Sequence, residues 1–190
     1  RRGGVNVAIS AGVDPRLKYN IIAMGGSAIA KLFRDSDERR IRRFRESVMR
    51  DRQMSEDALF EYIDQQIRTD PKNLAQYIDA RDAMVILSLF DSTVPIEYGK
   101  KLREEMGKPE TIYLIADHRT SALYTQFITL LPPGPPGLCN GLFPIDYIET
   151  ESVAFYDKRF GTNRGSLKHI IFSILQFPFT VVERAVRVVF

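Results

Sequence analysis

The sequence predicts an α/β fold built on the C-terminal part of a doubly wound, mostly parallel sheet. Short apolar runs alternate with helix-like segments from Val5 to Leu131, the order that places helices between parallel strands. The run AMVILSLF, Ala83 to Phe90, is apolar at nearly every position. Such continuous apolarity is typical of a parallel strand that helices cover on both faces.

Composition narrows the class of protein. A chain of 190 residues can form a hydrophobic core, and a net charge of +3 does not by itself indicate nucleic acid. A single cysteine, Cys139, excludes an internal disulfide framework and a multi-cysteine metal site, so we predict neither metal nor cofactor. The chain opens on Arg-Arg-Gly-Gly without methionine or signal peptide, which we interpret as a fragment or a processed chain. The sequence does not indicate the cellular compartment of the protein.

The first half of the chain predicts one helix, one strand and a long helical region. Val5 to Ala11 is small and apolar, which suits a short helix packed closely on a sheet. Tyr19 to Met24 is a short apolar run that ends at two glycines, and we expect a buried strand. Residues 28–78 have helical spacing and no strand signal, and the SEDA at Ser55 to Ala58 indicates a helix start.

The second half continues the alternation and then changes character. After the strand at Ala83 to Phe90 we expect a helix over Ile96 to Met106, a buried strand over Thr111 to Ala116 and a helix over Ala122 to Leu131. The run PPGPPG, Pro132 to Gly137, ends this first domain, residues 1–131.

Residues 132–190 are expected to form a proline-rich break followed by an extension with amphipathic helices. Ser166 to Phe190 is strongly apolar with scattered charges, and Pro178 should kink or break it. Its longest apolar run, Ile170 to Val182, is shorter than the roughly 20 residues that a transmembrane helix needs. A docked or interfacial helix fits better, which makes membrane-surface contact through 166–190 an expectation.

Two polar residues follow the two best strands and form the candidate site. Asp91 directly follows the run that ends at Phe90, and His118 follows the strand that ends near Ala116. Catalytic groups gather at the carboxyl ends of parallel strands, where a carboxylate can fix the tautomer of an imidazole. Taken alone, Asp91 would be a turn or N-cap aspartate, and His118 a surface loop histidine.

The segment DAMVILSLFDSTVPIEYGKKLREEMGKPETIYLIADHRTSALY, residues 82–124, resembles the last third of an α/β-hydrolase domain. In that family a strand ends in the triad acid, often with the pattern D-x-x-V-P, here Asp91 to Pro95. The triad histidine opens the loop after the next strand, here His118. The resemblance covers roughly residues 3–131 and implies acyl transfer of the esterase, lipase or peptidase kind.

The same family needs a serine nucleophile in a G-x-S-x-G turn between a strand and a helix. The opening stretch RRGGVNVAISAGVDPRLKYNII resembles the segment just after that serine. If Gly3 or Gly4 closes the motif, the nucleophile position falls on Arg1 or Arg2, and neither can attack a carbonyl. Either the serine lies upstream on a missing piece, or it has been replaced.

Ser27 is the internal alternative for the nucleophile. It follows two glycines between a predicted strand and a predicted helix, and the order Ser27, Asp91, His118 matches the family. Against it, Ile29 stands where the family has a closing glycine, and no strand is predicted between Ser27 and Ala83. The plain interpretation is a helix N-cap after a glycine turn.

The region 28–78 stands where the family inserts a cap or lid over the substrate cleft. It contains an arginine-rich stretch, Lys31 to Arg52, which carries more than the whole net charge of the chain. Such a stretch is most often a solvated helical face crossed by ion pairs, and binding to an anionic surface is the sharper alternative. Nucleic acid is disfavoured, because only Phe33 and Phe44 interleave with the charges.

The leading hypothesis is therefore the C-terminal part of a serine hydrolase acting on small-molecule esters or related acyl substrates. Asp91 would orient His118, and the chain would be an enzyme only when a nucleophile segment completes it. The alternative is a catalytically degenerate hydrolase-fold scaffold or interaction subunit. In either case an isolated half-sheet exposes a strand edge, so we expect the missing N-terminal part or another subunit to complete the sheet.

Overall fold

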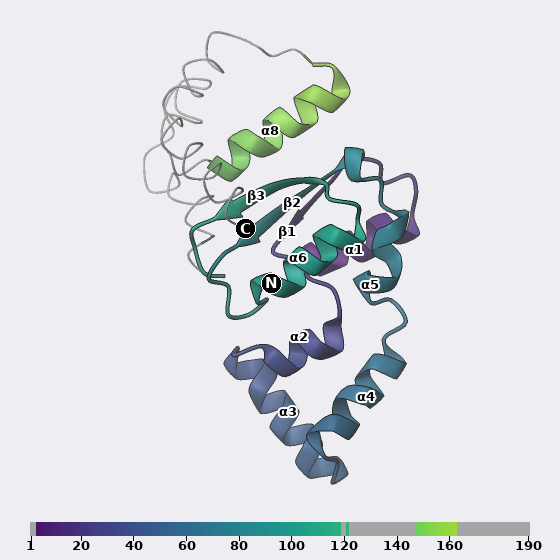
Figure 1. Cartoon of the computed structure of the whole chain (residues 1–190), viewed down its shortest axis with the longest axis vertical. Helices are drawn as coiled ribbons and strands as arrows, with labels where there is room; N and C mark the ends of the chain where they lie inside the picture. Colours follow the sequence, from purple (N-terminus) through teal and green to yellow (C-terminus); the bar gives the residue numbers. More distant parts are fainter. Residues whose placement is uncertain (1–2, 119–120, 122–146, 163–190) are drawn as a thin grey trace.

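The computed structural model describes residues 3–118, 121 and 147–162 and contains one parallel sheet of three strands (Figure 1). The strands are β1 (Asn20–Ala23), β2 (Ala83–Ser88) and β3 (Glu110–Leu114), and they lie side by side in the order β1-β2-β3. The predicted α/β class is confirmed at this level, because helices connect and cover parallel strands.

The central strand β2 is buried along its whole length, as its continuous apolarity predicts. It is shorter than the predicted strand, since Leu89 and Phe90 already belong to a turn. Their backbone N–H groups nevertheless donate to the carbonyls of Leu114 (2.9 Å) and Ala116 (3.0 Å) on the neighbouring segment. The two chain segments therefore stay paired up to the residue before Asp91.

Helices lie on both faces of the sheet. On one face, α1 (Gly3–Val13) and α6 (Ile96–Glu105) pack on alternate residues of β2, together with the short α5 (Pro71–Leu74) and η1 (Ala75–Tyr77). On the other face, α8 (Tyr147–Phe160) packs on the intervening residues (Figure 1). A further short helix, η2 (Ala80–Asp82), directly precedes β2.

The helix α1 approaches the sheet more closely than a side chain would permit. A Cβ atom at Gly4 would lie 2.1 Å from the carbonyl oxygen of Ala23, at the end of β1. One at Gly99, on α6, would lie 2.5 Å from Leu87 Cδ2. Glycine is therefore required at Gly4, where the contact is with backbone, whereas at Gly99 a side chain would displace the end of Leu87. The backbone of α1 begins directly against the carboxyl end of β1.

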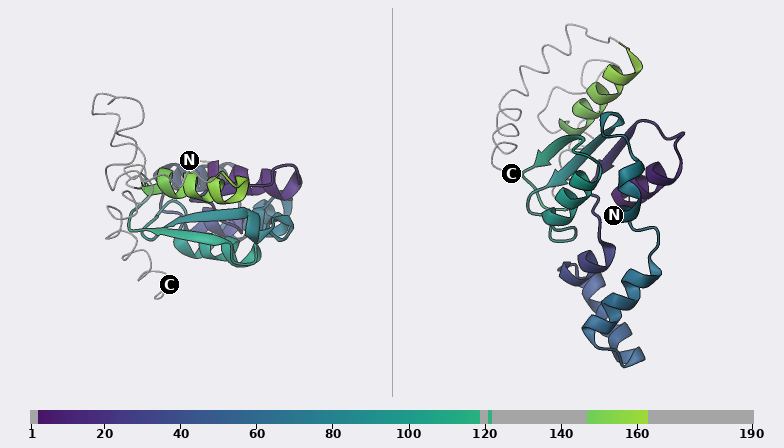
Figure 2. Two further views of the ribbon diagram at one scale, coloured as in Figure 1. Left: turned by 90° about the horizontal axis from the view of Figure 1, so that it is seen from above. Right: turned by 45° about the vertical axis from the view of Figure 1, so that its right-hand side comes forward.

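Between β1 and β2 the chain forms a helical arm that projects away from the sheet (Figure 2). The arm consists of α2 (Ile29–Asp35), α3 (Arg39–Arg52) and α4 (Glu56–Gln66), and the described residues 28–78 contain no strand. Ser55 caps α4, because its hydroxyl accepts the N–H of Ala58 (3.3 Å). The helical character and this start were both predicted.

The helix α8 was not recognised in the sequence, where Leu138 to Phe160 shows mixed signals. It packs on the sheet through the fully buried Phe155. The guanidinium of Arg159 lies 3.4 Å from the ring centre of Phe155 and donates to the carbonyl of Arg81 (2.8 Å). An aromatic and cationic helix face thus covers the second face of the sheet.

Several predictions lie outside the described residues: the helix at Ala122 to Leu131, the proline-rich break, Cys139 and the segment 166–190. Within the described residues, no helix is both long and apolar enough to cross a bilayer.

The two ends of the arm are joined by one buried carboxylate. Asp70, which is 1% exposed, accepts the N–H groups of Ala28 (3.0 Å) and Ile29 (2.7 Å), where the arm begins. It also accepts the N–H of Lys72 (2.9 Å) and so caps α5, where the arm ends. Three backbone donors therefore depend on this side chain.

We expect Asp70→Ala to lower the free energy of unfolding by about 3 kcal/mol, because it removes a cap and leaves buried N–H groups without an acceptor. Urea unfolding followed by circular dichroism measures this change. The matched control is Asp64→Ala, which removes an exposed carboxylate paired with Lys72 and should cost less than about 1 kcal/mol. Equal effects of the two substitutions would contradict the assigned role of Asp70.

Candidate functional site

The structure brings Asp91 and His118 together at the carboxyl edge of the sheet. Asp91 lies in the turn after β2, and His118 lies in the loop after the adjacent strand β3. The Asp91 Oδ2 atom is 2.7 Å from the His118 Nδ1 atom. The side chain of Asp91 is 2% exposed and that of His118 is 12% exposed, so this contact is largely shielded from water.

The second carboxylate oxygen of Asp91 holds its own turn. Oδ1 accepts the N–H groups of Thr93 and Val94, both at 2.8 Å. Two of the roles considered for Asp91 from the sequence are a turn aspartate and a partner of His118. Both are found, because Oδ1 holds the turn and Oδ2 bonds to His118. The N-cap interpretation is wrong, since the N-cap of α6 is Pro95. With all these donors in place, the carboxylate cannot rotate without breaking the turn.

The hydrogen bond to Asp91 determines which nitrogen of His118 is available. An ionised carboxylate can only accept, so Nδ1 carries the proton and the neutral ring presents Nε2 as an acceptor. No described residue forms a hydrogen bond with Nε2. The arrangement can therefore take a proton at Nε2 and stabilise the resulting imidazolium through Asp91.

A pair of buried serines anchors the loop that carries His118. The hydroxyls of Ser88, at the end of β2, and Ser121 are 2.7 Å apart, and Ser121 also donates to the carbonyl of Asp117. Both serines are buried. Sequence reasoning missed them, although Ser88 is the one polar residue in the apolar run AMVILSLF.

The arm is attached to the turn that Asp91 closes. The Ser36 hydroxyl donates to the carbonyl of Thr93 (2.9 Å), and the N–H of Asp37 donates to the carbonyl of Ser92 (3.1 Å). Beside them, the hydroxyl of Tyr98, on α6, donates to the carboxylate of Asp35. Burial, assisted by this hydrogen bond, raises the pKa of the Tyr98 phenol, so it remains a donor at neutral pH.

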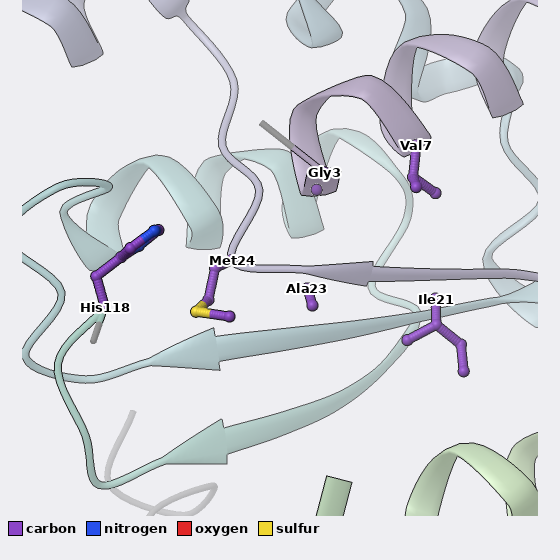
Figure 3. Close-up of a pocket in the computed structure, with 7 residues that line it drawn as sticks. Gly3, Val7, Ile21, Ala23, Met24 and His118 are labelled. Atoms are coloured by element: carbon purple, nitrogen blue, oxygen red, sulfur yellow. The ribbon is translucent and has the colours of Figure 1, made fainter. Parts of the chain in front are cut away.

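A cavity of about 350 Å³ lies beside His118, between the start of α1 and the edge of β1 that no described strand pairs with (Figure 3). Apart from the imidazole, its walls are glycine backbone and apolar side chains. The lining residues are Gly3, Gly4, Val7, Ile21, Ala23, Met24 and His118. The cavity thus places the imidazole and the first turn of α1 around one space.

Ser27 does not join this site. Its side chain is fully buried, its hydroxyl has no hydrogen-bond partner among the described residues, and it does not line the cavity. It is not the N-cap of α2 either, because that position is Ala28, whose N–H is held by Asp70. The N-cap interpretation of Ser27 is therefore wrong, and the described residues give no support to Ser27 as the nucleophile.

Comparison of the chain with protein-family models, curated proteins and solved structures finds no match. Among the described residues, no group of three or more His, Cys, Asp or Glu side chains is arranged to hold a metal ion. What can be said of the site therefore rests on its own geometry.

We expect Asp91→Asn to move the proton of neutral His118 from Nδ1 to Nε2. The N–H groups of Thr93 and Val94 would keep the amide oxygen in the turn, so the amide NH2 would face Nδ1 and require it to accept. Long-range ¹H–¹⁵N NMR of the histidine rings reads the tautomer directly.

The chain has two histidines, so a His169→Gln variant assigns the signals of His118. Asp79→Asn is the matched control, because Asp79 is an exposed turn aspartate before the opposite end of β2. An unchanged tautomer in Asp91→Asn, or an equal change in Asp79→Asn, would contradict the assignment.

Proposed function

We propose that this chain supplies the acid and base of a serine-hydrolase type of acyl-transfer site that acts on small-molecule esters. One observation carries the proposal: Asp91 is buried, held by its turn and hydrogen-bonded to His118, whose Nε2 has no partner among the described residues. This is the geometry that general-base activation of a hydroxyl requires. The resemblance of residues 82–124 to the α/β-hydrolase family agrees with it.

In the proposed reaction, His118 Nε2 takes the proton of a serine hydroxyl while that oxygen attacks the ester carbonyl. The imidazolium then returns the proton to the departing alcohol, and Asp91 orients and stabilises the ring throughout. Water repeats the same two steps on the acyl-enzyme, which releases the acid and restores the serine. Asp91 thus acts as a positioning residue and His118 as the catalytic base.

We propose that the nucleophile lies directly before the start of α1. Gly3 and Gly4 share the cavity with His118, and the close contact of Gly4 with Ala23 matches the tight strand-to-helix turn that a nucleophile elbow needs. The first N–H groups of an α-helix have no partners within the helix and lie at its positive end. Those of α1 would stabilise the oxyanion of the tetrahedral intermediate.

The free edge of β1 supports a serine-bearing strand that comes before α1. Within the described residues β1 pairs with β2 alone, so its other edge is unpaired. A parallel strand on that edge, followed by α1, would form the right-handed crossover that such units adopt. We propose that a preceding segment or another subunit provides it, and that the arm α2–α4 acts as a lid over the substrate.

The alternative is a degenerate hydrolase fold that serves as a scaffold. The arginines Arg1 and Arg2, which occupy the nucleophile position if Gly3 or Gly4 closes the motif, favour it. A scaffold could keep the bond between Asp91 and His118 for the stability of the loop alone. The two proposals differ in whether a serine next to His118 reacts.

We expect a fluorophosphonate probe to label the native protein on a serine in the segment that enters α1. Peptide mass spectrometry locates the label, and His118→Gln or Asp91→Asn should slow the labelling by at least about a thousandfold, because either change removes the activation of the hydroxyl. Asp79→Asn is the matched control and should leave the rate unchanged.

The 190-residue chain by itself should not turn over p-nitrophenyl esters, because its described residues contain no serine in contact with His118. Turnover that Ser27→Ala abolishes would establish the internal nucleophile instead. A fully folded native protein that the probe does not label would support the scaffold.

A further inference from the structure

The helix α3 carries an excess of positive charge that the fold does not use. It contains seven arginines and two acids, so its net charge of +5 exceeds that of the whole chain. Two arginines serve the fold: Arg45 donates to carbonyls at the end of α2, among them that of Phe33 (2.7 Å), and Arg52 lies over the ring of Tyr62.

The other five arginines of α3 have no side-chain partner among the described residues, and all are exposed. They are Arg39, Arg40, Arg42, Arg43 and Arg50. The acids of the same helix do not neutralise them, because among the described residues neither Glu46 nor Asp51 lies within ion-pair distance of an arginine. The interpretation of this stretch as a solvated helical face holds for α3, but no ion pair of this helix is found in the described part of the chain.

The position of these charges works against the stability of the helix. Four of the five lie in the first five residues of α3, where the only acid at the helix start is the N-cap residue Glu38, whose carboxylate accepts the N–H groups of Arg40 and Ile41. The N-terminal end of a helix is the positive end of its dipole, where cations are unfavourable. A cluster placed at this end is therefore not explained by stabilisation of α3.

The exposed side of α3 has the pattern of a helix face that binds a flat anionic surface. Arg39, Arg43 and Arg50 lie within about 40° of one another around the helix axis, and Arg40 flanks them. Phe44, which is 54% exposed, lies beside Arg40 and about 100° from Arg43 around the axis, at the margin of this exposed side. Arginine forks bind phosphate in pairs of hydrogen bonds, and a neighbouring exposed ring can enter the headgroup region.

We infer that the outer face of α3 docks the protein on an anionic phospholipid bilayer. Figure 1 shows α3 in the arm, away from the sheet, with α4 beside it. The helix α4 carries four acids and no basic residue. A nucleic acid that wrapped the arm would meet those carboxylates, whereas a flat bilayer contacts the outer face of α3 alone. Phe44 is the one aromatic residue of α3, so this helix offers no run of rings on which bases could stack.

Vesicle sedimentation tests the inference. The full 190-residue chain should bind vesicles of phosphatidylcholine with about a quarter phosphatidylserine, should not bind phosphatidylcholine alone, and should be released by salt. Arg39→Gln/Arg43→Gln should lower the partition coefficient by roughly 25-fold, about fivefold for each arginine. The same variant should melt at or above the temperature of the parent chain, because it removes cations from the start of α3.

The matched control is Arg68→Gln/Lys158→Gln, which removes two exposed cations outside α3 whose side chains have no partner in the part of the chain that the structure describes. It should lower partitioning by less than about threefold. Phe44→Ser should weaken binding with little change in its salt dependence, since it removes an apolar contact. Absence of binding to the anionic vesicles, or an equal loss in control and test variants, would overturn the inference. Tighter binding to a single-stranded RNA oligomer than to the vesicles would overturn it in favour of nucleic acid.

Discussion

The candidate site depends on the hydrogen bonds that the Asp91 carboxylate accepts. One oxygen holds the N–H groups of Thr93 and Val94, and the other holds the ring of His118. The cost of removing this carboxylate from water is met by hydrogen bonds to its ionised form. The orientation of the imidazole and the shape of the turn are therefore coupled, so a change that disturbs the turn also moves the ring of His118.

The same turn connects the site to the arm. Ser36 and Asp37, at the end of α2, bond to the backbone of Ser92 and Thr93, and Asp70 joins the two ends of the arm. The arm is thus held at its base by short polar contacts, while its outer face carries the five arginines of α3 that have no side-chain partner among the described residues. If the arm is a lid, a bilayer bound to α3 would act on the segment that contacts the turn of Asp91.

The contact between Asp91 and His118 was predicted from the sequence because it follows from the order of the strands. Asp91 and His118 follow adjacent parallel strands, and the ends of such strands meet at one edge, so their contact could be expected from the sequence. The bond between Ser88 and Ser121 could not, because it joins residues 33 apart through the packing of a loop. Ser27 shows the converse: its local sequence resembles a nucleophile turn, yet its hydroxyl is buried away from the cavity.

The sequence by itself determined the α/β class, the strands near their observed positions and the helical nature of the arm, because each follows from local periodicity and capping. Only the tertiary structure decided that Asp70 joins the two ends of the arm and that α8 covers the second face of the sheet. It also decided that five of the seven arginines of α3 have no side-chain partner among the described residues. These features depend on which segments meet in space. Local sequence patterns do not specify such tertiary contacts, since their free energy is set by packing and desolvation across the whole fold.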